Sequence, residues 1–455
     1  MGTFASALLV LTLCVLPQLA DAQPLIEFYR RALENNPTLR TSEHGVAQAE
    51  AQKDLVLSKL LPQVNYTANY YWNDNQEGSL PSRYYTGLRS AFQAQQALLD
   101  LPAYYLLKGA RFTVAQSEQL RQAARMTLAG ETVERYLTAL QTADEIANLQ
   151  SEKESIDSQQ KRLRYMRERQ LAKVTDLYEI EAYYQGLLTR EIEARSAHAE
   201  ALLRLSELSG LTAEQVSPLA RENFAAVPGR EEQWVSDAAR NNPNLIALQQ
   251  AIEAARMSIQ SGRAEYLPRV ALTASQTRSD QGYDNRLVPR YNVSTIGVQV
   301  TVPIYEGGRT AATLRDANAR LEIARERYEG TRREIERDTR TAYMSAESNH
   351  ARIGSTSQEV NALGKVVDAQ TKSYELGVST IIDVLIAQRR HFKARSDRMK
   401  ARYDYIRSFT LLRVRAGRLT DQDVEEIDSW MTGSVLPNGD VTRTGMQFPP
   451  AEPES

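Results

Sequence analysis

Residues 35–39 read NNPTL, and nearly the same pentapeptide, NNPNL, returns at residues 241–245. Asparagine favours the cap of a helix and proline fits the first helical turn, so each copy predicts the start of a helix. A single Asn-Asn-Pro motif indicates no more than that. The second copy raises the question of whether the sequence around the motif is repeated as well.

The surrounding sequence is repeated at almost the same spacing. The two motifs are 206 positions apart (241 − 35), and so are Pro62 in LLPQV and Pro268 in YLPRV. Further along the chain the offset is 207 positions, which pairs Gly210 in LSG with Gly417 in RAG. So regular an offset indicates a tandem duplication of two halves of roughly 200 residues, a unit too long for a solenoid repeat.

The N-terminus has the pattern of a secretory signal. Residues 4–16 are mostly apolar, and Ala-Asp-Ala at 20–22 is an A-x-A cleavage pattern, although no Lys or Arg precedes the apolar stretch. We expect residues 1–22 to be removed after Ala22. The only cysteine, Cys14, lies in this segment, so the mature chain can form no disulfide and has no thiol for catalysis.

Composition and hydropathy narrow the class of protein further. The net charge of −2 gives no reason to expect a nucleic-acid partner. After residue 22 there is no run of 18 apolar residues, so the sequence predicts no transmembrane helix. Two classes remain, a soluble exported protein and a membrane protein that is built from strands.

Two long stretches are typical of helix. No proline lies between Pro102 and Pro218 or between Pro303 and Pro437, and both stretches are rich in Ala, Leu, Glu, Arg and Gln. The longest predicted helices would each extend roughly 90–100 Å, which fits coiled coils or elongated bundles and not a compact globule. We predict helices at 103–165, 176–209, 309–373 and 381–416.

Each half also contains two candidate strands with alternating apolar residues, as in QVNYTANYYW, where Val64 and Tyr66 alternate with Asn65 and Thr67. Each strand has about the ten residues that a membrane-spanning strand needs, and a soluble amphipathic hairpin is the alternative. Four strands cannot close a barrel, so strands that span a membrane must share one barrel with other copies. The predicted strands are 63–74, 83–98, 269–281 and 290–303.

The sequence gives little support for catalysis. The four histidines are scattered without metal-ligand spacing, and no G-x-S-x-G or phosphate-loop pattern occurs. The carboxylates are mostly interspersed with arginine, as in RERYEGTRREIERDTR, which is typical of a solvated or helix-paired face. We predict a protein that is not an enzyme and has no cofactor and no metal site.

Three stretches carry a family resemblance. SYELGVSTIIDVLIAQ at 373–388 follows a Tyr-x-x-Gly…Asp-Val-Leu pattern, VPIYEGGR lies at 302–309, and LLRVRAGRLTDQDV lies near the C-terminus. With the repeated order of helix, strand pair and long helices, residues 24–432 resemble the TolC family of outer-membrane export ducts. The C-terminal stretch is similar to members that serve type I protein secretion.

The resemblance implies a mixed α and β membrane protein with an internal tandem duplication. Three chains, with four strands per chain, would form one trimeric 12-stranded outer-membrane β-barrel, continued by a long periplasmic α-helical barrel. The implied location is the outer membrane of a Gram-negative bacterium, extending into the periplasm. The expected division is two structural repeats at 23–210 and 229–417, an equatorial linker at 211–228, an equatorial helix at 418–432 and a disordered tail at 433–455.

The implied function is that of a passive channel-tunnel in a tripartite export system for type I protein secretion. Its implied partners are outer-membrane lipid, a periplasmic adaptor (membrane fusion protein) and an inner-membrane transporter such as an ABC exporter. One alternative is a multidrug or small-molecule efflux duct of the same architecture. A second alternative is an exported coiled-coil tether that forms no pore.

In the family, two helix–turn–helix tips meet the helical hairpins of the adaptor, and here they fall near 167–175 and 374–382. Gly377 suits a tight reversal because glycine readily adopts positive φ, whereas its counterpart in the first tip is Gln170 (377 − 207). The second tip is therefore the better candidate, although a glycine that only shapes the turn is the alternative. The candidate adaptor-contact residues are Gln170, Leu171, Ala172, Gly377, Val378 and Ser379.

The resemblance also implies a gate at the periplasmic end, where relatives have rings of aspartate. The ring position corresponds to Asp383, and a second ring position one helical turn on is occupied by Ile386, which could form an apolar constriction. A polar lock corresponds to Tyr374 with Thr175 and Asp176. The lock arginine of some relatives is replaced here by Ser379, and the alternative for both aspartates is a simple role at helix N-termini.

Overall fold

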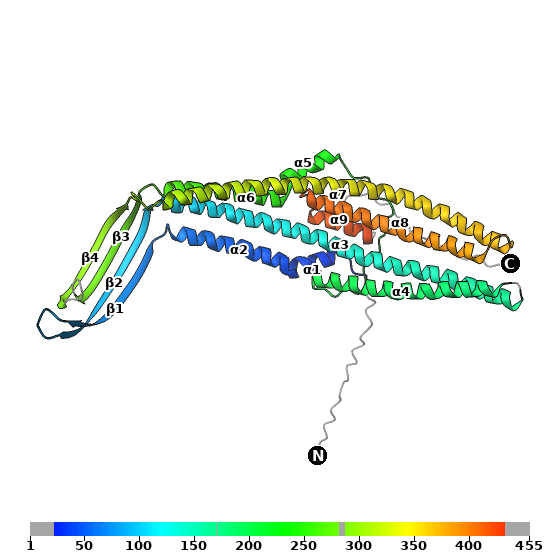
Figure 1. The fold of residues 1–455 in the computed structure, drawn as a ribbon, viewed down its shortest axis with the longest axis horizontal. Helices are drawn as coiled ribbons and strands as arrows, with labels where there is room; N and C mark the ends of the chain where they lie inside the picture. The colour runs from blue at the N-terminus through cyan, green and yellow to red at the C-terminus, as the bar shows by residue number, and fades with distance from the viewer. Residues whose placement is uncertain (1–21, 171, 282–286, 433–455) are drawn as a thin grey trace, which may run out of the picture.

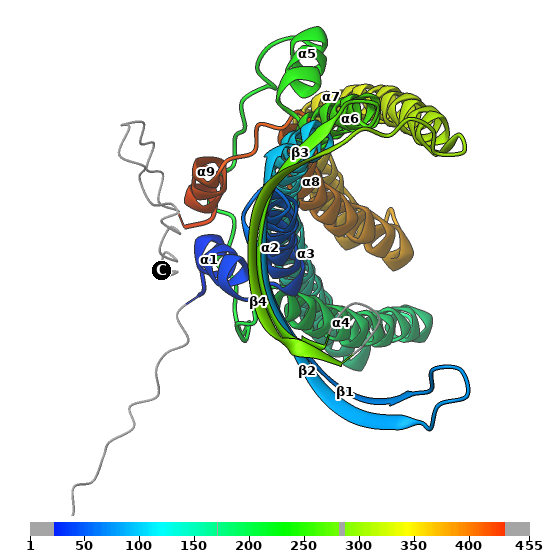
Figure 2. The same cartoon turned by 90° about the vertical axis from the view of Figure 1, so that its left-hand side faces the viewer.

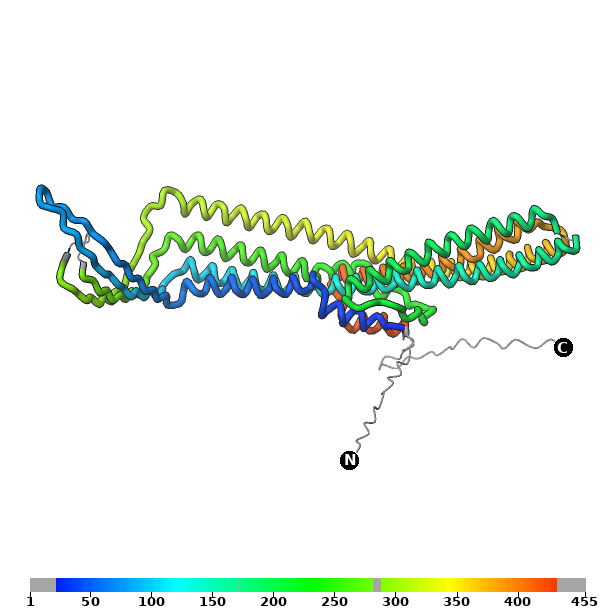
Figure 3. Tube along the Cα trace, turned by 90° about the horizontal axis from the view of Figure 1, so that it is seen from below, coloured from blue at the N-terminus to red at the C-terminus, as the bar shows by residue number. Residues whose placement is uncertain are grey.

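The computed structural model describes residues 22–170, 172–281 and 287–432, so residues 1–21 of the predicted signal and the predicted tail lie outside the described residues. The chain is elongated, with a sheet at one end and long helices that run away from it (Figure 1). Viewed from the sheet end, the sheet and the helices follow one curved arc (Figure 2). The halves of the helices that lie far from the sheet bend towards the concave side of this arc (Figure 3).

The sheet is antiparallel and its strand order is β1-β2-β3-β4. The strands are β1 (Gln63–Asn75), β2 (Arg83–Leu99), β3 (Arg269–Gln281) and β4 (Leu287–Thr301). The last strand begins three residues before the predicted 290 and ends two residues before the predicted 303. Each half of the duplicated chain therefore supplies one hairpin, and the two hairpins pair through β2 and β3.

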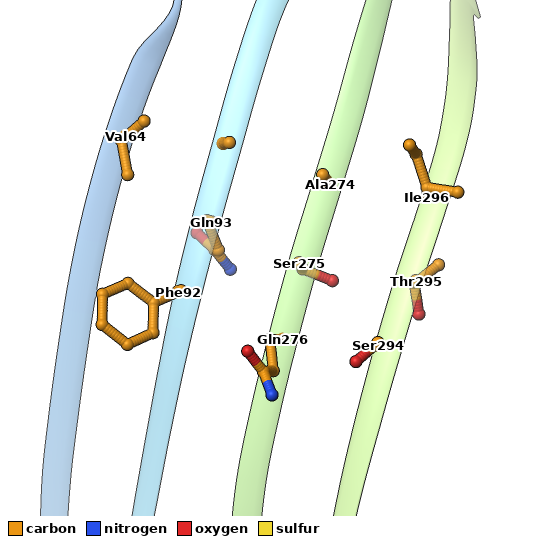
Figure 4. A pocket seen from close by; sticks show the side chains of 10 residues that line it. Val64, Phe92, Gln93, Ala274, Ser275, Gln276, Ser294, Thr295 and Ile296 are labelled. Atoms are coloured by element: carbon orange, nitrogen blue, oxygen red, sulfur yellow. The ribbon is translucent and has the colours of Figure 1, made fainter.

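The register places most of the large apolar residues of the four strands on one face. Tyr66 lies opposite Phe92, and Ala274 lies opposite Ile296, while Asn65 pairs with Gln93 on the other face. Figure 4 shows part of this sheet around a shallow hollow, whose lining includes Phe92, Ala274 and Ile296. The apolar face remains uncovered in the single chain, and its exposed members include Val64, Tyr66, Trp72, Phe92, Ile296 and Val298.

Four helices form the long part of the molecule: α3 (Leu101–Glu168), α4 (Val174–Ser209), α7 (Arg309–Glu375) and α8 (Ile381–Arg415). Helices α3 and α7 each reverse at a tight turn into the next helix, so α4 and α8 are return helices. The 68 residues of α3 extend about 100 Å at 1.5 Å per residue. In the described part of the chain, no helix combines the length and the apolar character that crossing a membrane requires.

Five shorter helices complete the chain: α1 (Leu25–Asn35), α2 (Pro37–Ser58), α5 (Glu231–Asn241), α6 (Pro243–Ala264) and α9 (Asp421–Thr432). The helices α2 and α6 run beside α3 near the sheet. The helices α1, α5 and α9 gather at mid-length, on the convex side of the arc (Figure 2). The main apolar core lies there and contains the buried Phe28, Tyr136, Trp234, Tyr403 and Trp430.

The repeated Asn-Asn-Pro motif fastens two helices in each half. The side chain of Asn36 accepts a hydrogen bond from the backbone N–H of Thr38 (2.9 Å), which caps α2, and donates to the carbonyl of Leu208 at the end of α4 (3.4 Å). Asn242 likewise caps α6 and donates to the carbonyl of Arg415 at the end of α8 (2.9 Å). The motif therefore recurs because each half joins the helix that follows the motif, α2 or α6, to a return helix, α4 or α8, in the same way.

The repeated glycines belong to the same junctions. Gly210 and Gly417 follow the return helices with φ of 71° and 69°, a conformation that suits glycine. A Cβ on Gly417 would lie 2.6 Å from the carbonyl oxygen of Asn241, and a Cβ on Gly210 would lie 3.3 Å from the Cβ of Asn35. Conformation and close approach together explain why LSG and RAG recur with the Asn-Asn-Pro motifs.

Candidate functional site

The predicted site residues gather at the end of the molecule opposite the sheet, where α3 turns into α4 and α7 turns into α8 (Figure 1). We call the turns at residues 169–173 and 376–380 the first tip and the second tip. The helices behind the tips share an apolar core, which includes Leu163 of α3, Leu177 of α4 and Leu385 of α8. This core holds the two tips of one chain next to each other.

The two tips have the same backbone reversal although their residues differ. Gln170 has a φ of 59° and Gly377 a φ of 74°, and Gln170 is the one non-glycine with positive φ in the described residues. The N–H of Gln170 donates to the carbonyl of Arg167 (2.8 Å), and that of Gly377 donates to the carbonyl of Tyr374 (3.0 Å). The left-handed conformation at Gln170 costs roughly 1–2 kcal/mol, so the first tip makes the same turn with strain.

The second tip presents apolar side chains to solvent. Leu376 is 79% exposed and Val378 is 81% exposed, while the N–H of Val378 donates to the carbonyl of Ser373 (2.9 Å). Ser379 is half-buried, and its hydroxyl donates to the carbonyl of Gln370 (3.3 Å). Ser379 therefore closes its own tip and makes no contact with Thr175 or Asp176.

The first tip is different in kind because it is cationic. Ala172 packs against the apolar core of the tip region, and Leu171 lies outside the described residues. None of the six Lys or Arg positions around this tip has a Lys or Arg 207 positions later. Counting basic residues in both halves of the sequence would have found this difference, which a comparison of the turn residues alone misses. The exposed cations are Lys161, Arg162, Arg164, Arg167, Arg169 and Lys173, and their counterparts are Asp368, Ala369, Thr371, Tyr374, Leu376 and Thr380.

Asp383 lies in a capping box at the start of α8. Its carboxylate accepts hydrogen bonds from the hydroxyl of Thr380 (2.7 Å) and from the backbone N–H of Thr380 (2.9 Å). These hydrogen bonds lower the pKa of Asp383 below its ordinary value of 3.8. Asp383 therefore stabilises the start of its helix, and its side chain remains exposed to solvent. Ile386, one turn on, is exposed as well.

The predicted lock residues lie together within one chain. The hydroxyl of Tyr374 on α7 is 3.5 Å from a carboxylate oxygen of Asp176 on α4, and the hydroxyl of Thr175 is 3.5 Å from the other oxygen. Burial, followed by the charge of Asp176, raises the pKa of Tyr374, so the phenol stays protonated and can donate. At 3.5 Å the phenol–carboxylate contact is a weak hydrogen bond.

A stronger link, which sequence reasoning missed, lies beside this pair. The guanidinium of Arg162 on α3 is 2.8 Å from the carboxylate of Glu375 on α7, the residue next to Tyr374. Both side chains are substantially exposed, so the pair is a surface ion pair. The two residues are 213 positions apart, and no local pattern in the sequence links them.

The described residues include no group of three or more His, Cys, Asp or Glu side chains that could hold a metal ion. The tip region therefore offers an arrangement of charges, hydrogen bonds and exposed apolar side chains. Such an arrangement can bind partners, attract ions and hold helices together.

Known proteins have similar sequences over most of this chain. Alkaline protease secretion protein AprF of Pseudomonas aeruginosa is 29% identical over 432 residues, which cover 91% of this chain and 88% of AprF. Outer membrane protein TolC of Vibrio cholerae is 27% identical over 416 residues, which cover 90% of this chain and 94% of TolC.

The fold also matches solved channels. The structure of CusC, described as forming a transmembrane channel, superimposes with a TM-score of 0.78 at 17% identity, and the match covers 87% of this chain and 92% of that chain. The family model "Outer membrane efflux protein" matches twice, at residues 28–211 and 234–418. The predicted fold, the predicted outer-membrane location and the prediction of a channel that is not an enzyme are confirmed by this family. The chain belongs to the outer membrane efflux protein family.

Proposed function

We propose that this channel is the outer-membrane duct of a type I protein secretion system. The observation that carries the proposal is the similarity to AprF, which is named for alkaline protease secretion and matches over most of both chains. The C-terminal LLRVRAGRLTDQDV stretch supports type I secretion less strongly than the similarity to AprF does. Its Gly417 packs on Asn241, and Arg413 pairs with Asp423, so structural contacts account for much of it.

The sheet supports a homotrimeric duct. The outer edges of β1 and β4 have no partner strand in the sheet of the described chain, and an unpaired edge cannot face lipid. Three chains supply twelve strands (3 × 4), which suffices for a closed barrel. The exposed apolar face of the sheet is then the surface that contacts outer-membrane lipid.

The long helices continue this barrel into the periplasm. Because sheet and helices follow one arc, three arcs form one tube with a continuous lumen (Figure 2). The tube closes where the tips converge. There Asp383 and Ile386 constrict the lumen, while the Tyr374–Asp176 and Arg162–Glu375 pairs fasten α7 to the α3–α4 pair.

The tips are the docking points for the periplasmic adaptor. The second tip offers the exposed apolar side chain of Val378 beside Gly377 and Ser379, and the first tip offers Gln170 and Ala172 within a cationic surface. An adaptor that engages both tips of one chain therefore needs two kinds of contact. An inner-membrane transporter of the ABC exporter class supplies energy and cargo, and the duct itself is passive.

Deletion of the gene tests the proposal. The account predicts that specific proteins disappear from the culture medium, that the intact gene restores them, and that susceptibility to toxic small molecules is unchanged. The converse result, a normal set of secreted proteins with raised drug susceptibility, would favour the multidrug efflux duct. The family description of outer-membrane efflux supports that second function.

A further inference from the structure

Three exposed side chains share one face of α8 near its start. Asp383, Ile386 and Arg390 follow each other at spacings of three and four residues, which places them on one helical stripe. The opposite stripe is buried against the neighbouring helices and contains Ile381, Val384, Leu385, Gln388 and Phe392. The exposed side of α8, which also includes Ile382, Arg389 and Lys393, is the part of the helix that is free to face the lumen.

The side chain of Arg390 has no binding partner within the described residues. In the described residues it has no ion pair, hydrogen bond or aromatic contact, unlike most arginines near the tips. The preceding Arg389 differs, because its charge acts on the buried Glu152 of α3. Two adjacent arginines, both exposed, thus point to different surroundings.

In a trimer the stripe would repeat three times around the lumen. Asp383 and Arg390 are seven residues apart, about 10 Å along the helix. The Debye length is about 8 Å at physiological ionic strength, so each ring of three charges sets the potential mainly in its own cross-section. A permeating ion would then meet a negative ring, an apolar constriction and a positive ring in series.

We propose that Arg390 forms a cationic ring behind the Asp383 ring and sets the ion selectivity of this duct together with it. The proposal rests on the proposed function, because it needs a trimeric pore. A cation is attracted by the Asp383 ring and repelled by the Arg390 ring. An anion is repelled by the Asp383 ring and attracted by the Arg390 ring. The closed duct therefore limits the leak of small ions of either sign.

The test is the reversal potential of purified full-length trimers in planar bilayers with a KCl gradient. Arg390→Gln should raise the permeability of K⁺ relative to Cl⁻ by at least fivefold, because one unit charge about 4 Å away in water already changes the local concentration of one ion about fivefold, and the ring removes three charges that act on K⁺ and Cl⁻ in opposite directions. The shift should shrink as the salt concentration rises. Arg389→Gln is the matched control, with the same charge change at the adjacent position, and it should leave selectivity near the wild-type value.

Three results would overturn the proposal. If Arg390→Gln trimers conduct with wild-type selectivity, Arg390 does not face the lumen, although the duct itself stands. If the variant lowers the temperature at which the trimer dissociates and leaves selectivity unchanged, Arg390 lies between subunits. If folded wild-type trimers carry no current at all, the proposed function fails and the inference fails with it.

Discussion

Gly210 and Gly417 end the two return helices in the same left-handed conformation, but the space around their α-carbons differs. Alanine in this conformation costs roughly 1–2 kcal/mol at either position. At Gly417 the added Cβ would also meet the backbone of Asn241 at 2.6 Å, whereas at Gly210 it meets only the side chain of Asn35 at 3.3 Å. Gly417→Ala should therefore lower the melting temperature of the purified protein, followed by circular dichroism, clearly more than Gly210→Ala. Equal shifts would contradict the role given to the Asn241 contact.

Asp383 gives a prediction on charge and pH. Asp383→Asn should lower cation selectivity in planar bilayers and leave the trimer intact, because asparagine keeps the shape of the side chain and removes its charge. Within one chain the hydrogen bonds from Thr380 lower the pKa of Asp383 below its ordinary value of 3.8, so the carboxylate is ionised at neutral pH. The stability that the capping contributes is present above the unfolded-state pKa and is lost as the pH falls through the lower folded-state pKa.

Reversal potentials measured from pH 7 to pH 3 check this prediction. Wild-type selectivity for cations should decline as the pH falls through the pKa of Asp383, and Asp383→Asn channels should show no such decline. A loss of selectivity at low pH that persists in Asp383→Asn channels would assign the titrating group elsewhere.

At the scale of the helices, the lock between α7 and the α3–α4 pair should depend mainly on Arg162 and Glu375. Arg162→Glu places two like charges together and should raise the resting conductance, whereas Arg162→Glu with Glu375→Arg restores an opposite pair and should lower it again. Tyr374→Phe removes only a weak hydrogen bond and should raise the conductance less. A double variant that leaks as much as Arg162→Glu would show that this ion pair does not hold the gate.

The second tip gives a prediction on partner binding. Val378→Glu puts a charge on an exposed apolar position and should abolish export, because an apolar contact with the adaptor cannot accommodate an unpaired carboxylate. The trimer should remain intact on a native gel, since the side chain packs against nothing in the chain. The same change at Leu203, an exposed leucine of α4, is the control and should export normally. Normal export from Val378→Glu would remove this tip from the adaptor interface.

The sequence was sufficient to predict the helices and strands, but not to predict several of the contacts between them. The absence of proline and the apolar alternation predicted the four long helices and four strands to within a few residues, because these signals are local. The Asn-Asn-Pro and glycine repeats revealed the duplication, yet only the structure shows that Asn242 and Gly417 meet at one junction. The Arg162–Glu375 pair could not be predicted, since it depends on how two hairpins of different halves pack.

At the scale of the whole molecule, the described chain has a sheet at one end and two tips at the other, joined by helices of about 100 Å. The 13 to 17 residues of its strands exceed the length needed to cross a hydrocarbon core of about 30 Å, even when the strands are tilted. A single chain leaves the apolar face and both sheet edges uncovered. The central claim is therefore that three chains share one pore.

Single-channel recording from mixed trimers tests this claim most directly. Wild-type and Asp383→Asn chains, co-expressed with different tags and purified together, should give channels with four discrete reversal potentials, for zero, one, two or three substituted subunits. If the channels showed only two reversal potentials, each chain would form its own pore. The absence of channels from folded oligomers would contradict the account altogether.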